Sequence, residues 1–343
     1  MRDLNWCRTG LCGLAAAIAL AGCAGALQPP AESAPQAAPL KSWMLPGAQK
    51  QSNLLYVSNV GARDVTVYTY ANGYGLLLVG TLAGFAQPTG MCADSAGDVF
   101  ISDVLTEFNK SGQVFEYAHG GTNPIYNLTL RLGFPYACAV DPKTGNLAVV
   151  VKHTGGNYGA YGAVNVYPEG GHSKSRKIYA AATGFSAVYS VTYDDKGNLY
   201  ADASPCFDSV CYYGGGPPGL YVLTPGSQYF TPLTLSGGTL YQPAAISWVN
   251  PIFLVGDENL QNQRSPGAYK VYVSGSSATV VGTIQYAGTQ QFFGSWRRAS
   301  RVIVPDYTGN VVRVYNLSDG SFVSELSSEI SSPYAAVVSQ GAK

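Results

Sequence analysis

The sequence predicts an all-β protein built as a six-bladed β-propeller, a ring of six four-stranded antiparallel sheets. Three observations lead to this prediction. A strand signature of the Val-x-Val-Tyr type recurs six times at intervals of about 45 to 55 residues, the spacing of propeller blades. The 343 residues include 41 glycines, which suit tight turns, and 25 tyrosines, which suit strands. We find no clear helical periodicity after the N-terminus.

The repeated unit is clearest between Pro88 and Tyr117. It starts with Pro88-Thr-Gly90 and runs through a first strand into the turn Asp94-Ser-Ala-Gly97-Asp98. Asp and Gly favour a tight hairpin there, because Gly tolerates positive φ and Asp bonds nearby backbone amides. A second strand, a loop and a third strand follow, and a fourth strand comes after the next turn.

The same order of strands recurs along the chain. First strands are expected at 90–93, 137–140, 188–193, 244–249 and 294–297. Second strands are expected at 54–59, 99–103, 147–151, 199–202, 252–257 and 302–306. Third strands are expected at 65–68, 114–117, 164–167, 220–223, 270–273 and 312–315, and fourth strands at 76–82, 124–130, 177–182, 232–235, 278–284 and 322–326.

The first unit lacks a first strand, since the repeats begin directly with a second strand at Leu54. The C-terminal segment 333–339 has the Pro-containing start of the other first strands. We therefore expect it to pair into the first blade, which closes the ring and removes two exposed sheet edges. The predicted propeller covers residues 52–340.

The N-terminus reads as a secretory signal. Arg2 and Arg8 precede an apolar run over 11–22, which is shorter than the roughly 20 residues that span a bilayer. It ends in Leu20-Ala21-Gly22-Cys23, which resembles a bacterial lipobox. The resemblance implies that residues 1–22 are removed and that Cys23 carries a lipid; an ordinary signal peptide ending near a cysteine is the alternative.

The resemblance also gives a cellular address. Ala24 in place of Asp implies an outer-membrane location if the host has an outer membrane. Acyl chains bury CH₂ groups at about 0.8 kcal/mol each, so several would hold the protein on a membrane. Residues 23–51, rich in Ala, Pro and Gln without a periodic apolar face, are predicted to be a disordered tether rather than a loosely packed cap.

The repeat motifs resemble a known family. The Pro-x-Gly start, the Asp…Gly-Asn/Asp turn, the strand Val99-Phe-Ile-Ser-Asp103 and the Val-x-Val-Tyr strand are similar to those of NHL-type and gluconolactonase-like six-bladed β-propellers. The resemblance covers 54–339 and implies the fold. It does not select one function, because such propellers include binding platforms, lactonases and lyases.

Polar residues end the second strands. The aligned positions are Asn59, Asp103, Lys152, Asp202, Asp257 and Asp306, with His153 next to Lys152. A circle of such groups at the channel mouth could hold Ca²⁺ or bind a cationic or hydroxyl-rich ligand. The alternative, which we favour, is that each Asp bonds backbone amides of its own or a neighbouring blade. Gluconolactonase-like enzymes hold a divalent metal with one Glu, two Asn and one Asp; Asn59, Asp202 and Asp257 match that set only in type.

Long loops after the second strands carry aromatic residues that could stack on sugar or peptide surfaces. These are Tyr158, Tyr161, Phe207, Tyr212 and Tyr213. The alternative is that the loops merely cover the channel. Cys206 and Cys211 lie in one of them and are expected to form a local disulfide in an oxidising compartment. Cys92 and Cys138 lie in first strands and are expected to be buried and unpaired.

Composition narrows the function. Charged residues make up 12% of the chain and the net charge is zero, so nothing favours nucleic-acid binding. With three histidines and no nucleophile motif, we expect a monomeric binding or scaffold module, membrane-anchored through its lipid, for a protein or glycan of the cell envelope. The alternative is a metal-dependent hydrolase or lactonase that uses the carboxylates of the channel mouth.

Overall fold

The computed structural model describes residues 41–71, 74–106, 111–131, 133–154, 160–173, 175–207, 211 and 215–341. The predicted signal peptide and Cys23 lie outside these residues. The regular secondary structure of the described residues is almost entirely β-strand, with three short 3-10 helices at Ala48–Lys50, Glu169–Gly171 and Leu260–Asn262. Within the described part, no helix has the length and apolar character that crossing a membrane requires.

The first sheet joins the two ends of the repeat region. Its strand order is β1-β4-β3-β2-β26, with β1 (Trp43–Met44), β2 (Asn53–Asn59), β3 (Asp64–Ala71), β4 (Tyr74–Leu82) and β26 (Pro333–Gln340). β26 pairs antiparallel with β2, from Asn53↔Gln340 to Asn59↔Pro333. The C-terminal strand thus supplies the strand that the first repeat lacks, as the sequence predicted.

The remaining strands form four further sheets. One has the order β5-β6-β7-β8, with β5 (Pro88–Ala93), β6 (Val99–Thr106), β7 (Ser111–Tyr117) and β8 (Pro124–Arg131). Another has the order β17-β21-β20-β19-β18, with β17 (Thr234–Ser236), β18 (Pro243–Val249), β19 (Ile252–Asp257), β20 (Gly267–Ser274) and β21 (Ser277–Gln285). A third has the order β22-β23-β24-β25, with β22 (Trp296–Arg298), β23 (Arg301–Asp306), β24 (Val311–Asn316) and β25 (Phe322–Leu326).

The fourth of these sheets has eight strands and two halves. One half contains β9 (Phe134–Val140), β10 (Leu147–Thr154), β11 (Ala160–Tyr167) and β12 (Lys177–Tyr179). The other contains β13 (Phe185–Tyr193), β14 (Leu199–Pro205), β15 (Gly219–Leu223) and β16 (Thr231–Pro232). A single residue pair, Gly162↔Phe185, connects β11 to β13.

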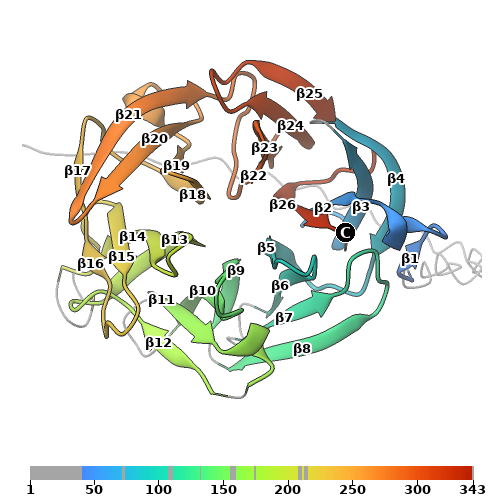
Figure 1. Ribbon diagram of the computed structural model, residues 1–343, viewed down its shortest axis with the longest axis horizontal. Helices are drawn as coiled ribbons and strands as arrows, with labels where there is room; N and C mark the ends of the chain where they lie inside the picture. Colours follow the sequence, from blue (N-terminus) through green and yellow to red (C-terminus); the bar gives the residue numbers. More distant parts are fainter. Residues whose placement is uncertain are drawn as a thin grey trace, which may run out of the picture. The chain divides into compact units, whose positions relative to one another are not determined.

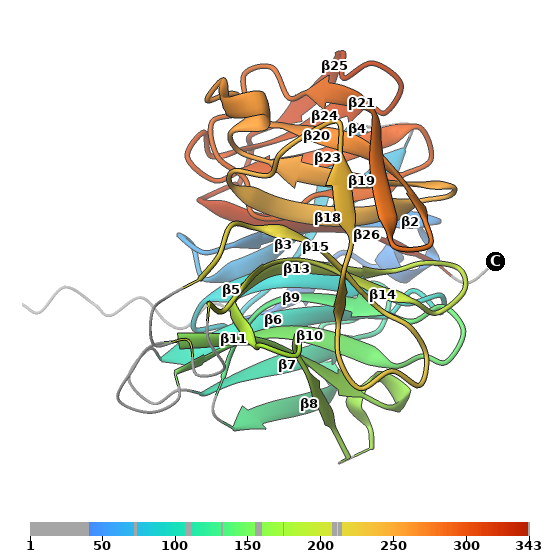
Figure 2. The same ribbon diagram turned by 90° about the vertical axis from the view of Figure 1, so that its left-hand side faces the viewer.

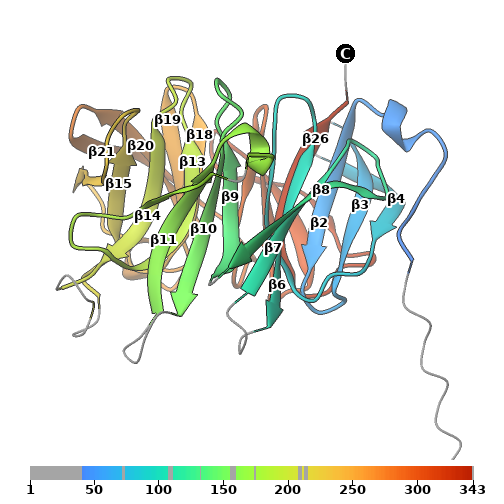
Figure 3. The same cartoon turned by 90° about the horizontal axis from the view of Figure 1, so that it is seen from below.

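The sheets stand in a ring, as Figure 1 shows. Each first strand contacts the next around the axis, in the order β26, β5, β9, β13, β18, β22 and back to β26. The strands of each sheet run alongside one another between the two faces of the ring (Figure 2, Figure 3). This arrangement is a β-propeller, so the prediction of an all-β propeller is confirmed.

Apolar side chains pack between neighbouring sheets rather than in one central core. Leu54, Tyr56 and Val337 of the first sheet pack with Val99 and Ile101 of the β5–β8 sheet. This is expected of strands whose two faces are both covered. At one such contact only glycine fits: Gly97, with φ +94°, lies so close to β26 that an added Cβ would sit 2.0 Å from the Gln340 carbonyl oxygen.

Two segments differ from the sequence prediction. The tether was expected to run to Gln51, but β1 pairs with the outer strand β4 and the Ala83 N–H donates to the Ser42 Oγ. The edge of β4 would otherwise leave backbone groups unpaired. The fourth strand expected at 232–235 is split: β16 pairs with β15, whereas β17 pairs in parallel with β21 of the next sheet.

Candidate functional site

Two cavities lie along the axis of the ring. The larger, of about 290 Å³, is lined by the second halves of the first strands and the turns that follow them; we call it the turn-side cavity. The smaller, of about 220 Å³, is lined by the beginnings of β13 and β18 and by residues at the β10–β11 end; we call it the loop-side cavity. Strand register places the ends of the second strands at the loop side, since Pro88 pairs with Asp103 and Pro243 with Asp257.

Aromatic side chains separate the two cavities. Tyr136, Phe293 and Tyr334 line both of them. The Phe293 and Tyr334 rings are stacked, with 4.9 Å between centroids and 18° between planes, and Tyr136 lies 6.5 Å from Tyr334. Burial raises the pKa of the Tyr334 hydroxyl, so this phenol stays neutral. The loop-side cavity therefore has an aromatic floor.

The described side chains of the predicted polar ring are buried and hydrogen bonded, mostly to backbone amides. Asn59, Asp103, Asp202, Asp257 and Asp306 are each 0% exposed, and none of them lines either axial cavity. Their oxygens accept hydrogen bonds from the segments that lead into the first strands. Asp103 accepts from the Ala86 and Gln87 amides, Asp257 from those of Tyr241 and Gln242, and Asp306 from those of Gln290 and Gln291.

This placement corrects the channel-mouth interpretation of these side chains. A carboxylate that ends a second strand meets two backbone amides of the preceding connection that would otherwise have no acceptor. Hydrogen bonds to these amides stabilise the buried negative charge. Asn59 does the same through its amide oxygen, which accepts from the Ser331 N–H, while its Nδ2 donates to Asp64 and Thr66. These contacts agree with the alternative interpretation of the sequence, in which each of these side chains bonds backbone amides of its own or a neighbouring blade.

Asp202 differs from the other four. Its Oδ1 accepts the Ser190 N–H at 2.6 Å, but its Oδ2 is buried without a hydrogen-bond partner among the described residues. Burial raises the pKa of the Asp202 carboxyl to about 7, with a smaller contribution from the Asp257 charge. A neutral carboxylic acid is the expected form wherever a buried oxygen has no donor to face.

Glu258 is a carboxyl that the sequence interpretation did not single out. Its Oε1 accepts the Phe292 N–H at 3.0 Å, one residue before the aromatic floor, and its own N–H donates to the Gln242 carbonyl. Burial raises the pKa of the Glu258 carboxyl to about 7, and the Asp257 charge adds to this. Its position directly after a strand-ending Asp is the one signal that could have identified it.

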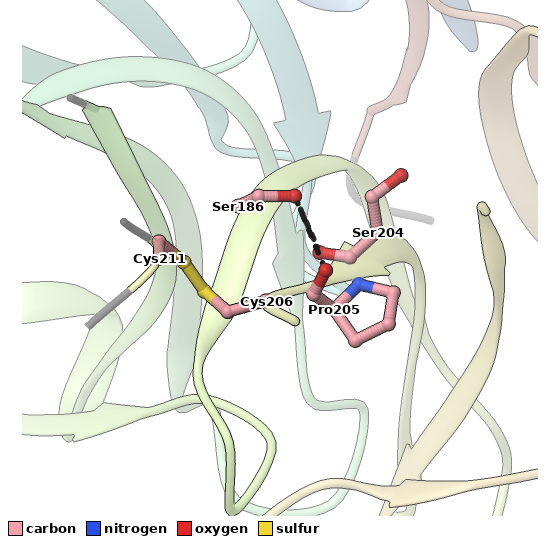
Figure 4. Close-up of a disulfide and its surroundings, with 5 residues drawn as sticks. All are labelled: Ser186, Ser204, Pro205, Cys206 and Cys211. Carbon is pink, nitrogen blue, oxygen red and sulfur yellow. Dashed lines mark hydrogen bonds between the residues drawn. A yellow bond between two sulfur atoms is a disulfide. The ribbon is translucent and has the colours of Figure 1, made fainter. Parts of the chain in front are cut away.

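One of the predicted aromatic loops flanks the loop-side cavity. Cys206 and Cys211 form a disulfide with Cα atoms 4.8 Å apart, and Figure 4 shows it beside Ser186. The Ser186 hydroxyl donates to the Ser204 carbonyl at 3.1 Å, and Ser186 lines the loop-side cavity. Phe207 within this loop is 65% exposed. The stapled loop therefore presents an aromatic side chain at the loop-side end.

The expectation that Cys92 and Cys138 are unpaired is wrong. They form a disulfide between β5 and β9, with 5.6 Å between Cα atoms. Both were placed in first strands, and adjacent first strands contact each other in the ring. The contact between β5 and β9 therefore brings the two sulfur atoms together, and a pattern within single repeats does not indicate this contact. The disulfide lies in the wall of the turn-side cavity.

Several predicted site residues fall outside the described part of the structure. Tyr158, Tyr212 and Tyr213 are not described, nor are the side chains of Lys152, His153 and Tyr161. The backbone places Lys152 opposite Phe134 and His153 opposite Tyr161 in the sheet.

The metal set implied by the family resemblance does not fit the residues that the structure describes. In the described ranges no three His, Cys, Asp or Glu residues gather as a metal site. The polar atoms of Asn59 and Asp257 are already engaged: Asp257 accepts the Tyr241, Gln242 and Asn259 amides. An ion would have to displace these bonds.

Comparison with known proteins identifies the fold. No protein-family model and no curated sequence matches the chain. A structure of a nidogen/laminin complex matches with a TM-score of 0.59 and 14% identity, over 84% of this chain and 99% of that chain. A Bacteroides caccae protein of unknown function matches with 0.55 and 13%, over 84% and 99%. A Bacteroides fragilis protein described as a putative 6-phosphogluconolactonase matches with 0.52 and 12%, over 85% and 99%. At such identities the similarity shows a shared β-propeller fold alone.

Proposed function

We propose that the chain is a lipid-anchored, extracytoplasmic β-propeller with six blades that binds a protein or a glycan of the cell envelope at its loop-side end. The six first strands that contact one another around the axis support the blade count, if the two halves of the eight-stranded sheet are taken as separate blades. The lipobox-like Leu20-Ala21-Gly22-Cys23 supports the anchor and the envelope location.

The aromatic floor of the loop-side cavity is the observation that carries the binding role. Tyr136, Tyr189, Phe293 and Tyr334 line a space of about 220 Å³, beside a disulfide-stapled loop with the exposed Phe207. Rigid aromatic faces stack on sugar rings and on apolar peptide side chains at a low cost in conformational entropy. Backbone amides occupy the strand-ending carboxylates except for the Asp202 Oδ2, which favours binding over chemistry by these groups.

A hydrolase is the second candidate, and Glu258 is the observation that favours it. A carboxyl whose pKa is raised to about 7 is suited to exchange protons near neutral pH. Glu258 lies next to the aromatic floor, since it holds the Phe292 amide. In this candidate Glu258 would act as the general acid or base toward an ester or lactone bound at the loop-side cavity.

Two experiments test the proposal. For the anchor, cells fed an alkyne-bearing fatty acid should label the wild-type chain and leave the Cys23→Ser variant unlabelled; equal labelling would contradict lipidation at Cys23. For binding, the purified chain is tested against an array of envelope glycans and against purified envelope proteins.

The binding experiment depends on one pair of variants. Tyr334→Leu removes the stacked ring but keeps an apolar side chain, and it should lower affinity for the ligand found by about tenfold. Tyr229→Leu is the matched control, because Tyr229 is 56% exposed and lines neither axial cavity. Equal affinity of the two variants would contradict binding on the aromatic floor, and ester hydrolysis lost in Glu258→Gln would favour the second candidate.

A further inference from the structure

The wall of the turn-side cavity includes a cationic side chain that is unpaired within the described protein. Arg297 lies on β22, lines this cavity and is exposed. It makes no hydrogen bond and no ion pair with another described residue. Its neighbours behave differently: the Arg298 Nη2 donates to the Asn53 Oδ1 at 2.8 Å, and Arg301 bonds to the Asn316 side chain.

Strand geometry explains the contrast between Arg297 and Arg298. Successive residues of a strand point to opposite faces, so only one of the two can reach the first sheet. Arg298 does so and does not line the cavity. Arg297 is left with five unused N–H donors in a planar fork, the geometry that binds a carboxylate through two parallel hydrogen bonds.

The rest of the cavity wall is mostly apolar and aromatic. Trp248, Trp296 and Tyr193 line it from three different sheets, and the Cys92–Cys138 disulfide forms part of another side. A volume of about 290 Å³ lies just below the range for small-molecule sites, roughly 300–1,000 Å³. The space therefore suits one ring-sized apolar group rather than a long chain.

We infer that the turn-side cavity binds a small amphipathic carboxylate, a molecule with one flat apolar group and one carboxylate. The apolar group would lie against Trp248 and Trp296, and the carboxylate would pair with the Arg297 guanidinium at the rim. The other charged residue of the wall, Asp195, is already engaged, since its Oδ2 accepts from the Asn250 side chain at 2.7 Å. This site is at the opposite end of the axis from the loop-side cavity, so it does not depend on the proposed function.

The test uses 3-phenylpropionate as the probe and its amide, 3-phenylpropionamide, as a neutral molecule of the same shape. Binding to the full chain is followed by calorimetry and by tryptophan fluorescence, because two of the four tryptophans line the cavity. Arg297→Gln removes the charge, and Arg298→Gln is the matched control on the same strand. Thermal unfolding of each variant verifies that it is folded.

The wild-type chain is expected to bind the acid at least about tenfold more tightly than the amide, the discrimination typical of a hydrogen-bonded charge. Arg297→Gln should abolish this preference and leave amide binding unchanged, whereas Arg298→Gln should keep it. Equal affinities for acid and amide, an unaltered preference in Arg297→Gln, or no saturable binding of the acid at its solubility limit would each overturn the inference. The Tyr334→Leu variant and the envelope ligands test the loop-side proposal. The result with 3-phenylpropionate and Arg297→Gln can be interpreted without them.

Discussion

His119 and Ser339 are hydrogen bonded, with 2.6 Å between the Nδ1 and Oγ atoms, although 220 residues separate them. The other ring nitrogen of His119 lies 2.8 Å from the carbonyl oxygen of Gln51, and the Ser339 hydroxyl bonds to the Gly97 carbonyl. One imidazole therefore joins the entry to the first sheet, the closing strand β26 and, through Ser339, the β5–β6 turn.

We predict that His119→Ala weakens the closure of the ring. A partly buried hydrogen bond to Ser339 and an exposed one to Gln51 are lost, so the free energy of unfolding should fall by about 1–3 kcal/mol. Hydrogen exchange should accelerate most in the amides of β26 and β2. The control is His172→Ala, because His172 stacks on Tyr126 and pairs with Glu116 away from β26. Unchanged exchange in β26 would show that His119 does not hold the closing strand.

The stabilisation by His119 should depend on pH. Burial lowers the pKa of the His119 imidazole below its usual value of 6.5, against weaker opposing effects of the hydrogen bond to the Gln51 carbonyl and of the Asp98 charge. Below pH 6.5 the unfolded chain binds the proton more readily than the folded one, so stability falls as the pH falls through this window. The stability difference between wild type and His119→Gln should therefore be larger at pH 7.5 than at pH 5. A difference independent of pH would contradict the lowered pKa of the His119 imidazole.

The Cys92–Cys138 disulfide should contribute more stability than Cys206–Cys211. It closes a loop of 46 residues, against 5 for the second bridge. The entropy model gives about 4 kcal/mol for the longer loop and about 2 kcal/mol for the shorter. Urea unfolding without added oxidant compares two double variants, Cys92→Ser/Cys138→Ser and Cys206→Ser/Cys211→Ser. Alkylation with and without reductant verifies both bridges beforehand, and two thiols at Cys92 and Cys138 in the unreduced protein would contradict the pairing.

The sequence predicted the elements that local patterns determine. The six Val-x-Val-Tyr signatures all lie in strands, and β19 and β25 begin and end where the pattern placed them. Closure of the ring by 333–339 could be predicted because the first repeat lacks one strand and the C-terminal end has one strand more than its repeat needs. Pairing of these two ends completes the first sheet. These predictions were possible because the same motif occurs several times in the sequence.

Contacts between sheets could not be predicted in the same way. The approach of Cys92 to Cys138 depends on how two sheets pack against each other, and it cannot be predicted from the residues of one repeat alone. Likewise, the repeat placed Asp257 at the end of its strand, but whether its carboxylate meets the channel or the Tyr241 amide depends on the path of the preceding connection. Glu258 was missed because it has no counterpart in the other repeats.

The role of the strand-ending carboxylates can be tested at Asp257. Its side chain accepts the amides of Tyr241, Gln242 and Asn259, so Asp257→Ala leaves three donors without an acceptor. We predict a loss of about 3 kcal/mol or more in the free energy of unfolding. Asp195→Ala, at an exposed carboxylate, should change it by less than about 1 kcal/mol. A stable, fully folded Asp257→Ala that had lost only ligand binding would instead assign Asp257 to a binding site.

Asp202 should give the opposite result, because its carboxyl is buried with one oxygen unpartnered. Burial raises its pKa from 3.8 to about 7, so between these values the folded protein holds a proton that the unfolded chain has released. Stability therefore falls as the pH rises through this window, the reverse of the effect of a paired carboxylate.

Asp202→Asn mimics the neutral acid and can still accept the Ser190 N–H. At pH 4 the variant should match wild type in the free energy of unfolding. At pH 8 it should be more stable by roughly 4 kcal/mol, since only wild type then bears the cost of a carboxyl pKa raised from 3.8 to about 7, at about 1.4 kcal/mol per pH unit. Urea unfolding at the two pH values measures both differences. Glu258→Gln in the same series separates the contribution of the second carboxyl with a raised pKa, and a loss of stability in Asp202→Asn at pH 8 would mean that the Asp202 Oδ2 is ionised and held by a partner.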